Sequence, residues 1–470
     1  MFKLIIKKTC IIFIFFLCSC NFSFANINEL MNEPLQKTTL RTGCSCEYRM
    51  NSININWWDN FTDLHVKEYI YKALEKNHDV KKAALKSQEY REMVNVTMAQ
   101  EFPILTFAPT FARVKTANSQ IFDIATPQLR TNIYAMPFLS AYEADIFLKN
   151  HDKTQSSKKQ YEAAEYEEKA SDIAIASDVA SLYINILKSD KLIENATKIN
   201  NIRTKILELT NLQYKEGLAS VYDVTYTDKQ KTLSQISLND LKKQRQILLH
   251  QMFVYIDECP SDENVLERGN LDELDFRGII PESISSENVV MRPDLMKAEA
   301  ELKKAKIDVK IARKEFLPSI PIIGVAGYNS LFLSRLFDWQ NIFALVGVAA
   351  VQKFYTGGKL TANLRIKKIQ YEQLFENYKQ ADLKAIQEVN DSLCMIWFDT
   401  KTDKDNEKKL NLEKKNYYMN TLKYKEGIMS YLDLIKFQEN LLSVQSEKDM
   451  SKSQKLIDYI TLYKAMGSKL

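Results

Sequence analysis

Two long segments of the chain place apolar residues at the spacing of a coiled-coil helix. In the first segment, steps of seven, three, four and three residues separate Leu192, Ile199, Ile202, Ile206 and Leu209, which is a narrow apolar seam. No proline or glycine interrupts the chain from His151 to Thr210, and about 60 residues at ~1.5 Å each form a rod roughly 90 Å long. Gln370–Leu422 has the same character. The pattern predicts two long, charged helices.

Four shorter runs between the helical segments alternate as β-strands do. They are Ile104–Val114, Ile133–Phe147, Ile320–Tyr328 and Ile342–Tyr355. In the first run, small or polar residues alternate with Leu105, Phe107 and Phe111. The second run places on one face Tyr134, Met136, Phe138 and Tyr142.

Three prolines weaken this strand assignment, and polar segments join the runs in pairs. Proline cannot donate to a β-ladder, so its presence inside three of the runs weakens the assignment there (Pro109, Pro137 and Pro321). Each pair of runs is joined by a polar segment, Lys115–Thr131 or Asn329–Asn341, which we expect to be an exposed loop. Aromatic residues near the ends of the runs fit either an interfacial girdle or an ordinary core.

The helices and strands occur twice. Asp79-Val80 and Pro103 match Asp294-Leu295 and Pro318 at a shift of 215 residues. Tyr-Lys-Glu-Gly and the aspartate six residues after its glycine recur at a shift of 210, with Gly217 and Asp223 matching Gly427 and Asp433. Each repeat therefore reads helix, strand, loop, strand, long helix, turn, helix.

The recurring glycines mark the turns of two helical hairpins, Gly217 in the first repeat and Gly427 in the second. Glycine adopts left-handed backbone angles at a helix end without steric cost. Ser220 and Ser430 follow three residues later, where a hydroxyl can cap the next helix. Asp223 and Asp433 fall in the first turn of that helix, where the helix dipole by itself favours a carboxylate.

The first twenty residues predict export. Three lysines (Lys3, Lys7 and Lys8) precede a short apolar run that ends in Leu17-Cys18-Ser19-Cys20, as in a secretory signal peptide. This ending resembles the bacterial lipobox, so Cys20 is the expected lipidated residue, with a plain signal peptide as the alternative. Acyl chains anchor a protein by burying many CH₂ groups. No run of 18 apolar residues follows Cys20, so we expect no membrane-spanning helix.

We divide the chain accordingly. The segments are a signal peptide (1–19), an N-terminal tether and equatorial segment (20–75), repeat 1 (76–257), a polar connector (258–290), repeat 2 (291–466) and a C-terminal tail (467–470).

The charge balance and the motif spacing argue against a nucleic-acid-binding protein, a metal site and an enzyme. After removal of residues 1–19, 61 basic residues face 60 acidic ones, so the balance does not suggest a nucleic-acid partner. His65, His78, His151 and His250 are dispersed, without metal-ligand spacing. Thr356-Gly-Gly-Lys359 lacks two elements of a phosphate-binding loop, its earlier glycine and its following Ser or Thr. We therefore expect no enzyme activity, no metal and no cofactor. Cys44, Cys46, Cys259 and Cys394 cannot be paired from the sequence.

Four strands cannot close a membrane barrel alone, because the smallest membrane barrels need about eight. Open strand edges are not tolerated in hydrocarbon. Either the strands form an ordinary soluble sheet or several chains share one barrel.

Short motifs along the chain resemble the TolC-like outer-membrane efflux proteins, in particular the lipoprotein branch that serves resistance-nodulation-division pumps. The similarity runs from about Trp57 to Gly467. Its first-half motifs are Trp57-Trp58, Phe61, Asp63 and Ala73-Leu74-Glu-Lys-Asn77-His-Asp79. Its second-half motifs are Arg292-Pro-Asp-Leu295, Phe316-Leu-Pro-Ser319, Gly357-Gly-Lys359 and Leu462-Tyr-Lys-Ala-Met-Gly467.

The resemblance implies a mainly α-helical, two-repeat protomer. In a homotrimer, the long helices would form a periplasmic α-barrel and the four strands would contribute to a shared 12-stranded membrane β-barrel. It further implies a lipid-anchored outer-membrane channel that works with a periplasmic adaptor and an inner-membrane pump to export small molecules. A type I secretion conduit, and a periplasmic coiled-coil adaptor or structural lipoprotein, are the alternatives. The cargo, the pump and the adaptor cannot be deduced from the sequence.

The resemblance also assigns a periplasmic gate. Asp433 matches the family's mouth aspartate, Asp223 is its first-repeat counterpart, and Tyr424 matches the tyrosine of the closed-state network. This chain departs from the pattern at Lys436, where some members have an acidic residue, and at Met429, where some have arginine. A third departure is Leu148, where the lipoprotein branch has a glycine like Gly358, so the first strand-to-helix turn must form without a permissive residue.

Overall fold

The computed structural model describes residues 57–115, 119–121, 124–126, 130–261, 265–278 and 289–467. The predicted signal peptide, Cys20, Cys44 and Cys46 lie outside these residues. The chain divides into two compact units. The first holds the described parts of Gln88–Ala163 and Glu299–Asn377, and the second holds those of Cys44–Ser87, Ala164–Ala298 and Tyr378–Leu470.

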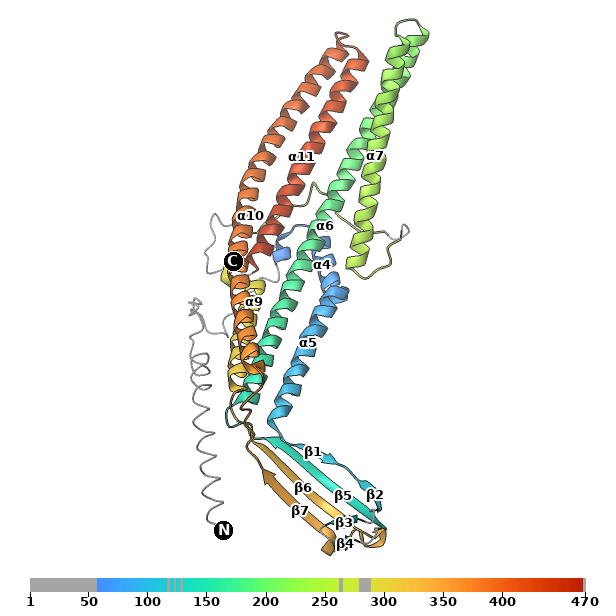
Figure 1. Ribbon diagram of the computed structural model, residues 1–470. Helices are drawn as coiled ribbons and strands as arrows, with labels where there is room; N and C mark the ends of the chain where they lie inside the picture. Colours follow the sequence, from blue (N-terminus) through green and yellow to red (C-terminus); the bar gives the residue numbers. More distant parts are fainter. Residues whose placement is uncertain are drawn as a thin grey trace. The chain divides into compact units, whose positions relative to one another are not determined.

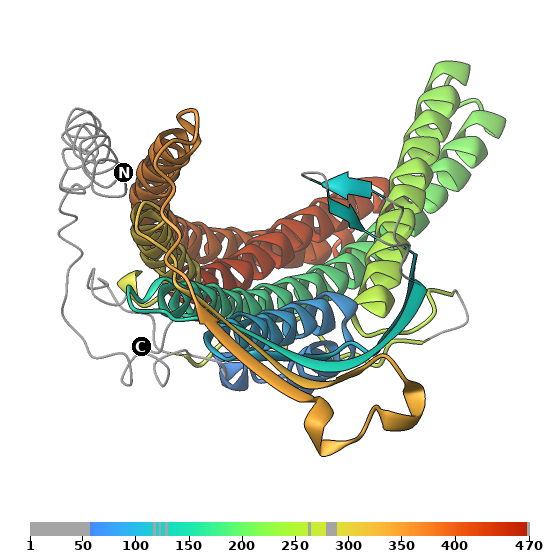
Figure 2. The same ribbon diagram turned by 60° about the horizontal axis from the view of Figure 1, so that its bottom comes forward.

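The first unit is built around an antiparallel sheet. Its strands run in the order β1-β5-β6-β7. Strand β2 also pairs with β5, with residues that precede those paired with β1. Figure 2 shows β5, β6 and β7 as long, curved strands lying side by side. The bounds are β1 Ile104–Phe107, β2 Thr110–Lys115, β5 Arg130–Glu143, β6 Pro321–Ser330 and β7 Ile342–Val348.

The prolines change the strands in different ways. Pro109 lies between β1 and β2, so the first predicted strand is broken in two there, because proline has no N–H to donate. Pro137, in contrast, lies inside the central strand β5 and pairs with Gly327 of β6. A side chain at Gly327 would come within 2.2 Å of the Met136 carbonyl oxygen, so glycine is what permits this close pairing.

Two sequence predictions need correction in this unit. The segment Lys115–Thr131, expected to be a loop, contains two short paired strands, β3 (Ser119–Ile121) and β4 (Ile124–Thr126). The fourth strand ends at Val348, not at Tyr355, because only Val351 of the remaining residues makes a bridge, to Ser319.

The second unit contains two antiparallel helix pairs, drawn in green and in orange to red in Figure 1. The pair α6 (Lys149–Lys215) and α7 (Val221–Tyr255) forms the first hairpin, and α10 (Lys359–Lys425) and α11 (Tyr431–Met466) form the second. Shorter helices are α4 (Leu64–Lys76), α5 (His78–Met98) and α9 (Pro293–Lys314). Helices α5, α6, α9 and α10 contribute residues to both units.

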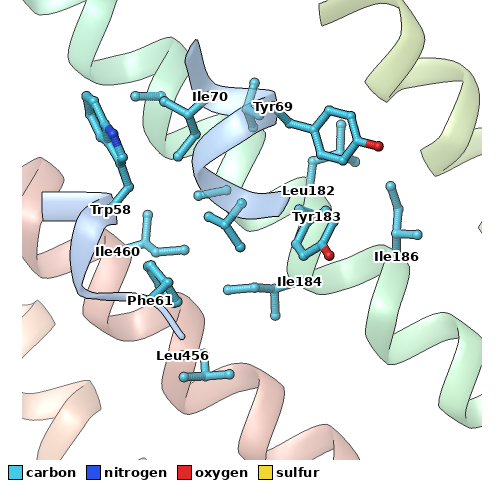
Figure 3. Packing of buried hydrophobic residues seen from close by; sticks show 14 of the residues in the cluster. Trp58, Phe61, Tyr69, Ile70, Leu182, Tyr183, Ile184, Ile186, Leu456 and Ile460 are labelled. Carbon is cyan, nitrogen blue, oxygen red and sulfur yellow. The ribbon is translucent and has the colours of Figure 1, made fainter. Parts of the chain in front are cut away.

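The main apolar core of the second unit gathers residues from distant parts of the sequence. Figure 3 shows Trp58, Phe61 and Ile70 beside Tyr183 and Ile184 of α6 and Ile460 of α11. The Tyr183 hydroxyl donates to Asp63 Oδ2 at 2.6 Å and accepts from the Gly269 N–H at 2.9 Å. The Trp57 to Asp63 motif is therefore a packing motif, which fastens the start of α4 onto α6 and α11.

The polar connector also packs into this core. Leu271 and Leu274 are almost fully buried, and the Phe276 ring contacts the rings of Tyr459 and Tyr463 of α11. Although the connector is polar on average, its few apolar residues fix it in place.

The Arg292-Pro-Asp-Leu295 motif ties α9 to the second hairpin. The buried Arg292 guanidinium donates to Asp294 and Glu388, both at 2.7 Å, and to the Ala465 carbonyl near the end of α11 at 2.8 Å. Gly467 ends α11 with a left-handed φ of 56°.

Among the described residues, one helix, α6, contains an 18-residue window that is long and apolar enough to cross a membrane. The sequence-based expectation that no such segment follows Cys20 is therefore too strict. However, 61% of the window is buried inside the protein, as is common for a core helix.

Candidate functional site

The sheet carries a large aromatic face. The strand register places Phe107 opposite Phe138, with ring centroids 4.8 Å apart, and Phe111 opposite Tyr134, 5.0 Å apart. The aromatic residues predicted to lie on one face of the first two strands therefore share a single face. Half or more of Phe107 and Phe138 is exposed. An uncovered face of this kind is typical of contact with a membrane or another protein.

The sheet is open at both edges. β7 pairs with β6 alone and β1 and β2 pair with β5 alone, so one side of β7 and one side of β1 and β2 have no partner strand in the described chain. Unpaired strand edges expose backbone N–H and C=O groups that bind further strands. The geometry of the sheet is therefore that of an incomplete assembly.

The two strand-to-helix junctions use different chemistry. Leu148 takes a left-handed φ of 56° just before α6, and the Asp145 carboxylate accepts from the N–H groups of Lys149 and His151 at 2.6 and 2.8 Å. In the second repeat, Gly357 and Gly358 supply the positive φ values, 60° and 82°. Leu148 is thus held in a strained conformation by the helix that Asp145 caps.

The first hairpin turn lies between α6 and α7. Gly217 has a φ of 72°, its N–H donates to the Tyr214 carbonyl at 3.0 Å, and the Leu218 N–H donates to the Gln213 carbonyl at 2.7 Å. Such paired bonds close a helix end around a left-handed residue.

Asp223 begins the returning helix in a capping box. Its N–H donates to Ser220 Oγ at 3.2 Å, while its carboxylate accepts from the Ser220 N–H at 2.9 Å and hydroxyl at 2.7 Å. The bonds from the backbone and then the side chain of Ser220 lower the pKa of Asp223. This carboxylate is ionised at neutral pH.

The second turn repeats this backbone and the serine–aspartate pair, and a lysine is added to it. Gly427 has a φ of 75°, and the Ser430 hydroxyl donates to Asp433 Oδ2 at 2.7 Å. Lys436 also approaches Asp433, with Nζ 3.3 Å from Oδ1. The bonds from Ser430 and then Lys436 lower the pKa of Asp433, so this carboxylate is also charged but partly compensated.

Tyr424 lies close to the second turn. Its ring centroid is 5.7 Å from that of Tyr431, the first residue of α11, and 39% of Tyr424 is exposed. The structure therefore brings Tyr424 to the same turn as Asp433. The roles of Asp223, Tyr424 and Asp433 in a gate stay predictions.

Sequence reasoning missed the contacts that join the hairpins. Arg203 of α6 donates from Nε and Nη2 to Glu439 Oε1 of α11 at 2.9 and 2.6 Å, and from Nη1 to the Gln230 carbonyl of α7 at 2.9 Å. One arginine thus links three helices. A lone Arg and a lone Glu 236 residues apart leave no local signal, so only long-range pairing could have revealed them.

The charged residues buried inside the second hairpin could not be predicted from the sequence either. Asp403 of α10 is 5% exposed and accepts from Lys448 Nζ at 2.5 Å and Lys455 Nζ at 2.8 Å, both on α11. Burial opposes ionisation of Asp403, but the bonds from the two lysines outweigh burial and lower its pKa. Within the described ranges, no group of three or more His, Cys, Asp or Glu side chains is arranged to hold a metal ion.

Comparisons with known proteins agree with the geometry. A family model described as Outer membrane efflux protein matches residues 69–254 and 285–468. The probable outer membrane lipoprotein SilC of Salmonella typhimurium is 26% identical over 483 residues, covering 99% of each chain. The solvent efflux pump outer membrane protein SrpC of Pseudomonas putida is 24% identical over 422 residues, covering 87% of this chain and 86% of SrpC.

The fold matches a solved channel. The crystal structure of the Campylobacter jejuni CmeC outer membrane channel superposes with a TM-score of 0.78 at 20% identity, covering 94% of this chain and 91% of CmeC. The predicted fold class and family are confirmed. The chain belongs to the outer membrane efflux protein family.

Proposed function

We propose that three copies of this chain assemble into an outer-membrane channel of a tripartite efflux system. The observation that carries this proposal is the sheet of the first unit, with its exposed aromatic face and two open edges. The open edges are not stable in an isolated protomer in a membrane, because unpaired backbone groups cost several kcal/mol each in hydrocarbon.

A barrel shared by three chains accounts for both the open strand edges and the exposed aromatic face. If β7 of one copy pairs with β1 and β2 of the next, every edge is satisfied. Counting β1 and β2 as one broken strand, three chains supply 12 strands, which exceeds the minimum of about eight. The aromatic face, with Phe107 and Phe138, then faces lipid, and the opposite face of the same strands lines the lumen.

The long hairpins extend the channel as a helical tube in the periplasm. Their turns, with Asp223 and Asp433, form its periplasmic mouth and the meeting place for a periplasmic adaptor and an inner-membrane pump. Tyr424 belongs to the contacts that close this mouth. Small molecules are the proposed cargo, consistent with the efflux role in the name of SrpC. Cys20 carries the lipid anchor, consistent with the lipoprotein name of SilC.

The test is electrophoresis of the purified membrane fraction with and without heating. Wild type should fractionate with the outer membrane as a heat-sensitive trimer. Phe138→Arg places a charge on the proposed lipid face, which costs about 2–4 kcal/mol near the bilayer centre, so it should lose the trimer.

Leu139→Arg is the matched control, because the next residue of β5 lies on the opposite face. It should retain the trimer. Recovery of wild type as a soluble periplasmic monomer would contradict the channel, and equal loss in both variants would contradict the assignment of the faces.

A further inference from the structure

The second hairpin buries a carboxyl pair. Asp458 of α11 is 1% exposed, and its Oδ1 accepts from Gln454 Nε2 at 2.9 Å. Its other oxygen, Oδ2, is buried and receives no hydrogen bond from a donor in the described part of the chain. The half-buried Asp399 of α10 lies within hydrogen-bonding reach of Asp458. Two carboxyl groups therefore meet across the interface of α10 and α11.

The neighbouring charged groups are engaged elsewhere. Lys455 donates to Asp403, four residues beyond Asp399 on α10, and Lys452 donates to the carbonyls of Leu271 and Asp272 in the connector. Asp275 of the connector faces Lys452 and Lys455, Asp178 of α6 pairs with Lys464, and Lys401 of α10 lies over the Trp397 ring.

Asp458 has lost its hydration and lies beside a second carboxylate that repels it, so holding both groups ionised is costly. One shared proton removes the repulsion and supplies a hydrogen-bond donor between the two carboxyl groups. We propose that Asp458 holds a proton that bridges to Asp399 and that this pair acts as a pH-sensitive clamp, which packs α11 against α10 when protonated and loosens when Asp458 loses the proton.

The clamp belongs to the second hairpin alone. At the shift of 210 residues that relates the two turns, the counterparts of Asp399 and Asp458 are Ser189 and Leu248. The first hairpin thus has neither carboxyl, and it serves as a control within the same molecule.

The direction of the pH effect follows from burial. Burial, followed by the hydrogen bond with Asp399, raises the pKa of Asp458 from 3.8 to about 7. Because the folded-state pKa is raised, the stabilisation is complete below the unfolded pKa and is lost as pH rises through the folded pKa. Linkage to one proton changes the opening equilibrium of α10 and α11 by up to about tenfold per pH unit within this window.

The test is hydrogen exchange, read by mass spectrometry, on the full chain purified in detergent at pH 5 to 8 and corrected for intrinsic exchange rates. Peptides around Asp399 and Asp458 should lose protection by up to about tenfold per pH unit as pH approaches 7. Peptides around Ser189 and Leu248 should show no such slope. Equal slopes in both hairpins would overturn the proposal.

Asp458→Asn tests whether the carboxyl pair causes the pH slope of the second hairpin. Asparagine has the same shape, can still accept from Gln454 and can donate to Asp399, but it does not titrate. The variant should flatten the pH slope of the second hairpin. Asp399→Asn, at the less buried member of the pair, leaves Asp458 able to titrate but offers its carboxylate an amide donor. This variant should therefore move the slope to lower pH, and it guards against misfolding of the first variant.

Asp403→Asn is the control, because it weakens the same helix interface without removing the carboxyl pair. It should lower protection at every pH and keep the slope. An unchanged slope in both Asp458→Asn and Asp399→Asn would overturn the proposal. Exchange does not measure conduction, so this result is independent of the proposed channel function.

Discussion

The two helical hairpins of the second unit share a backbone plan but bury different side chains. The first is packed along apolar residues such as Ile202, Leu238 and Leu249. The second places Asp403 and Asp458 in its interior, at positions whose first-hairpin counterparts are Ile193 and Leu248. The repeat thus preserves helix geometry and turn glycines, while the side chains between the paired helices have diverged.

An interface between helices that buries charges loses stability differently from one that buries only apolar side chains. An apolar seam loses stability in proportion to the volume removed, and it has no pH dependence. A seam of buried charges is sensitive to the loss of any one partner, because the remaining charge stays buried and unpaired. The second hairpin, which carries the turn with Asp433 and Tyr424, is therefore the one whose helix packing pH should alter through Asp458.

The largest expected effect comes from removing Asp403. Asp403→Ala leaves Lys448 and Lys455 facing each other without a carboxylate between them, so the free energy of unfolding of the second hairpin should fall by about 3–5 kcal/mol. Hydrogen exchange of α10 and α11 measures it. Asp405→Ala, at an exposed position two residues away, should change the same quantity by less than about 0.5 kcal/mol. Equal effects would mean that burial of Asp403 is unimportant.

The next effect concerns the link between the hairpins. Glu439→Ala removes the acceptor of Arg203, a charge-assisted contact worth about 1.5–3 kcal/mol. If the hairpins must separate to open the mouth, conductance in planar bilayers should rise. Glu447→Ala, which removes only the exposed pair with Lys409, is the matched change on the same helix and should leave conductance unchanged. A Glu439→Ala channel that conducts like wild type would show that this link is not part of the closed state.

A smaller effect distinguishes the two strand-to-helix junctions. Leu148 is 55% exposed and has a φ of 56°, so Leu148→Gly loses little burial and relieves a conformation that costs a non-glycine residue roughly 1–2 kcal/mol. The unfolding free energy should rise by about 1 kcal/mol in thermal denaturation. Leu212→Gly, at an exposed site inside the same helix, should lower it by about 0.5–1 kcal/mol. If both variants are destabilised, Leu148 is not strained.

The smallest effect compares the two turns. Lys436 stabilises the charge of Asp433 by only ~0.2–0.5 kcal/mol, as is usual for an exposed pair on one helix. The bonds that lower the pKa of Asp223 come from Ser220 and not from a lysine. Three copies of each aspartate at the mouth should attract cations. In planar bilayers, Asp433→Ala should reduce cation selectivity and relieve block by multivalent cations, and Lys436→Ala should enhance both.

Asp223→Ala tests whether the first-repeat turn contributes to the same mouth. It should reduce selectivity at least as much as Asp433→Ala, because no lysine compensates Asp223 in the bonds that lower its pKa. If none of the three changes alters selectivity or block, the aspartates serve only to start their helices.

The repeats, the strand runs and the turns could be predicted because each is a local pattern. Seven- and three-residue apolar steps favour a coiled-coil helix, and alternation favours a strand. A glycine followed by a serine three residues later is a hairpin turn in both repeats. The family motifs added the fold class, which the solved channels confirm. The break of the first strand at Pro109 was visible as a proline, but the tolerance of Pro137 was not, since it depends on Gly327 across the sheet.

The two-repeat order of elements, the family, and the turns that carry Gly217 and Gly427 can be read from the sequence, because they depend on neighbours in the chain. Which distant side chains meet depends on the folded structure. Arg203 with Glu439, Asp403 with two lysines, and Asp399 with Asp458 all join residues from separate helices. Their energies depend on burial, and burial is set by the packing of whole helices, so the same aspartate is an ordinary surface charge or a proton clamp according to what lies across the interface.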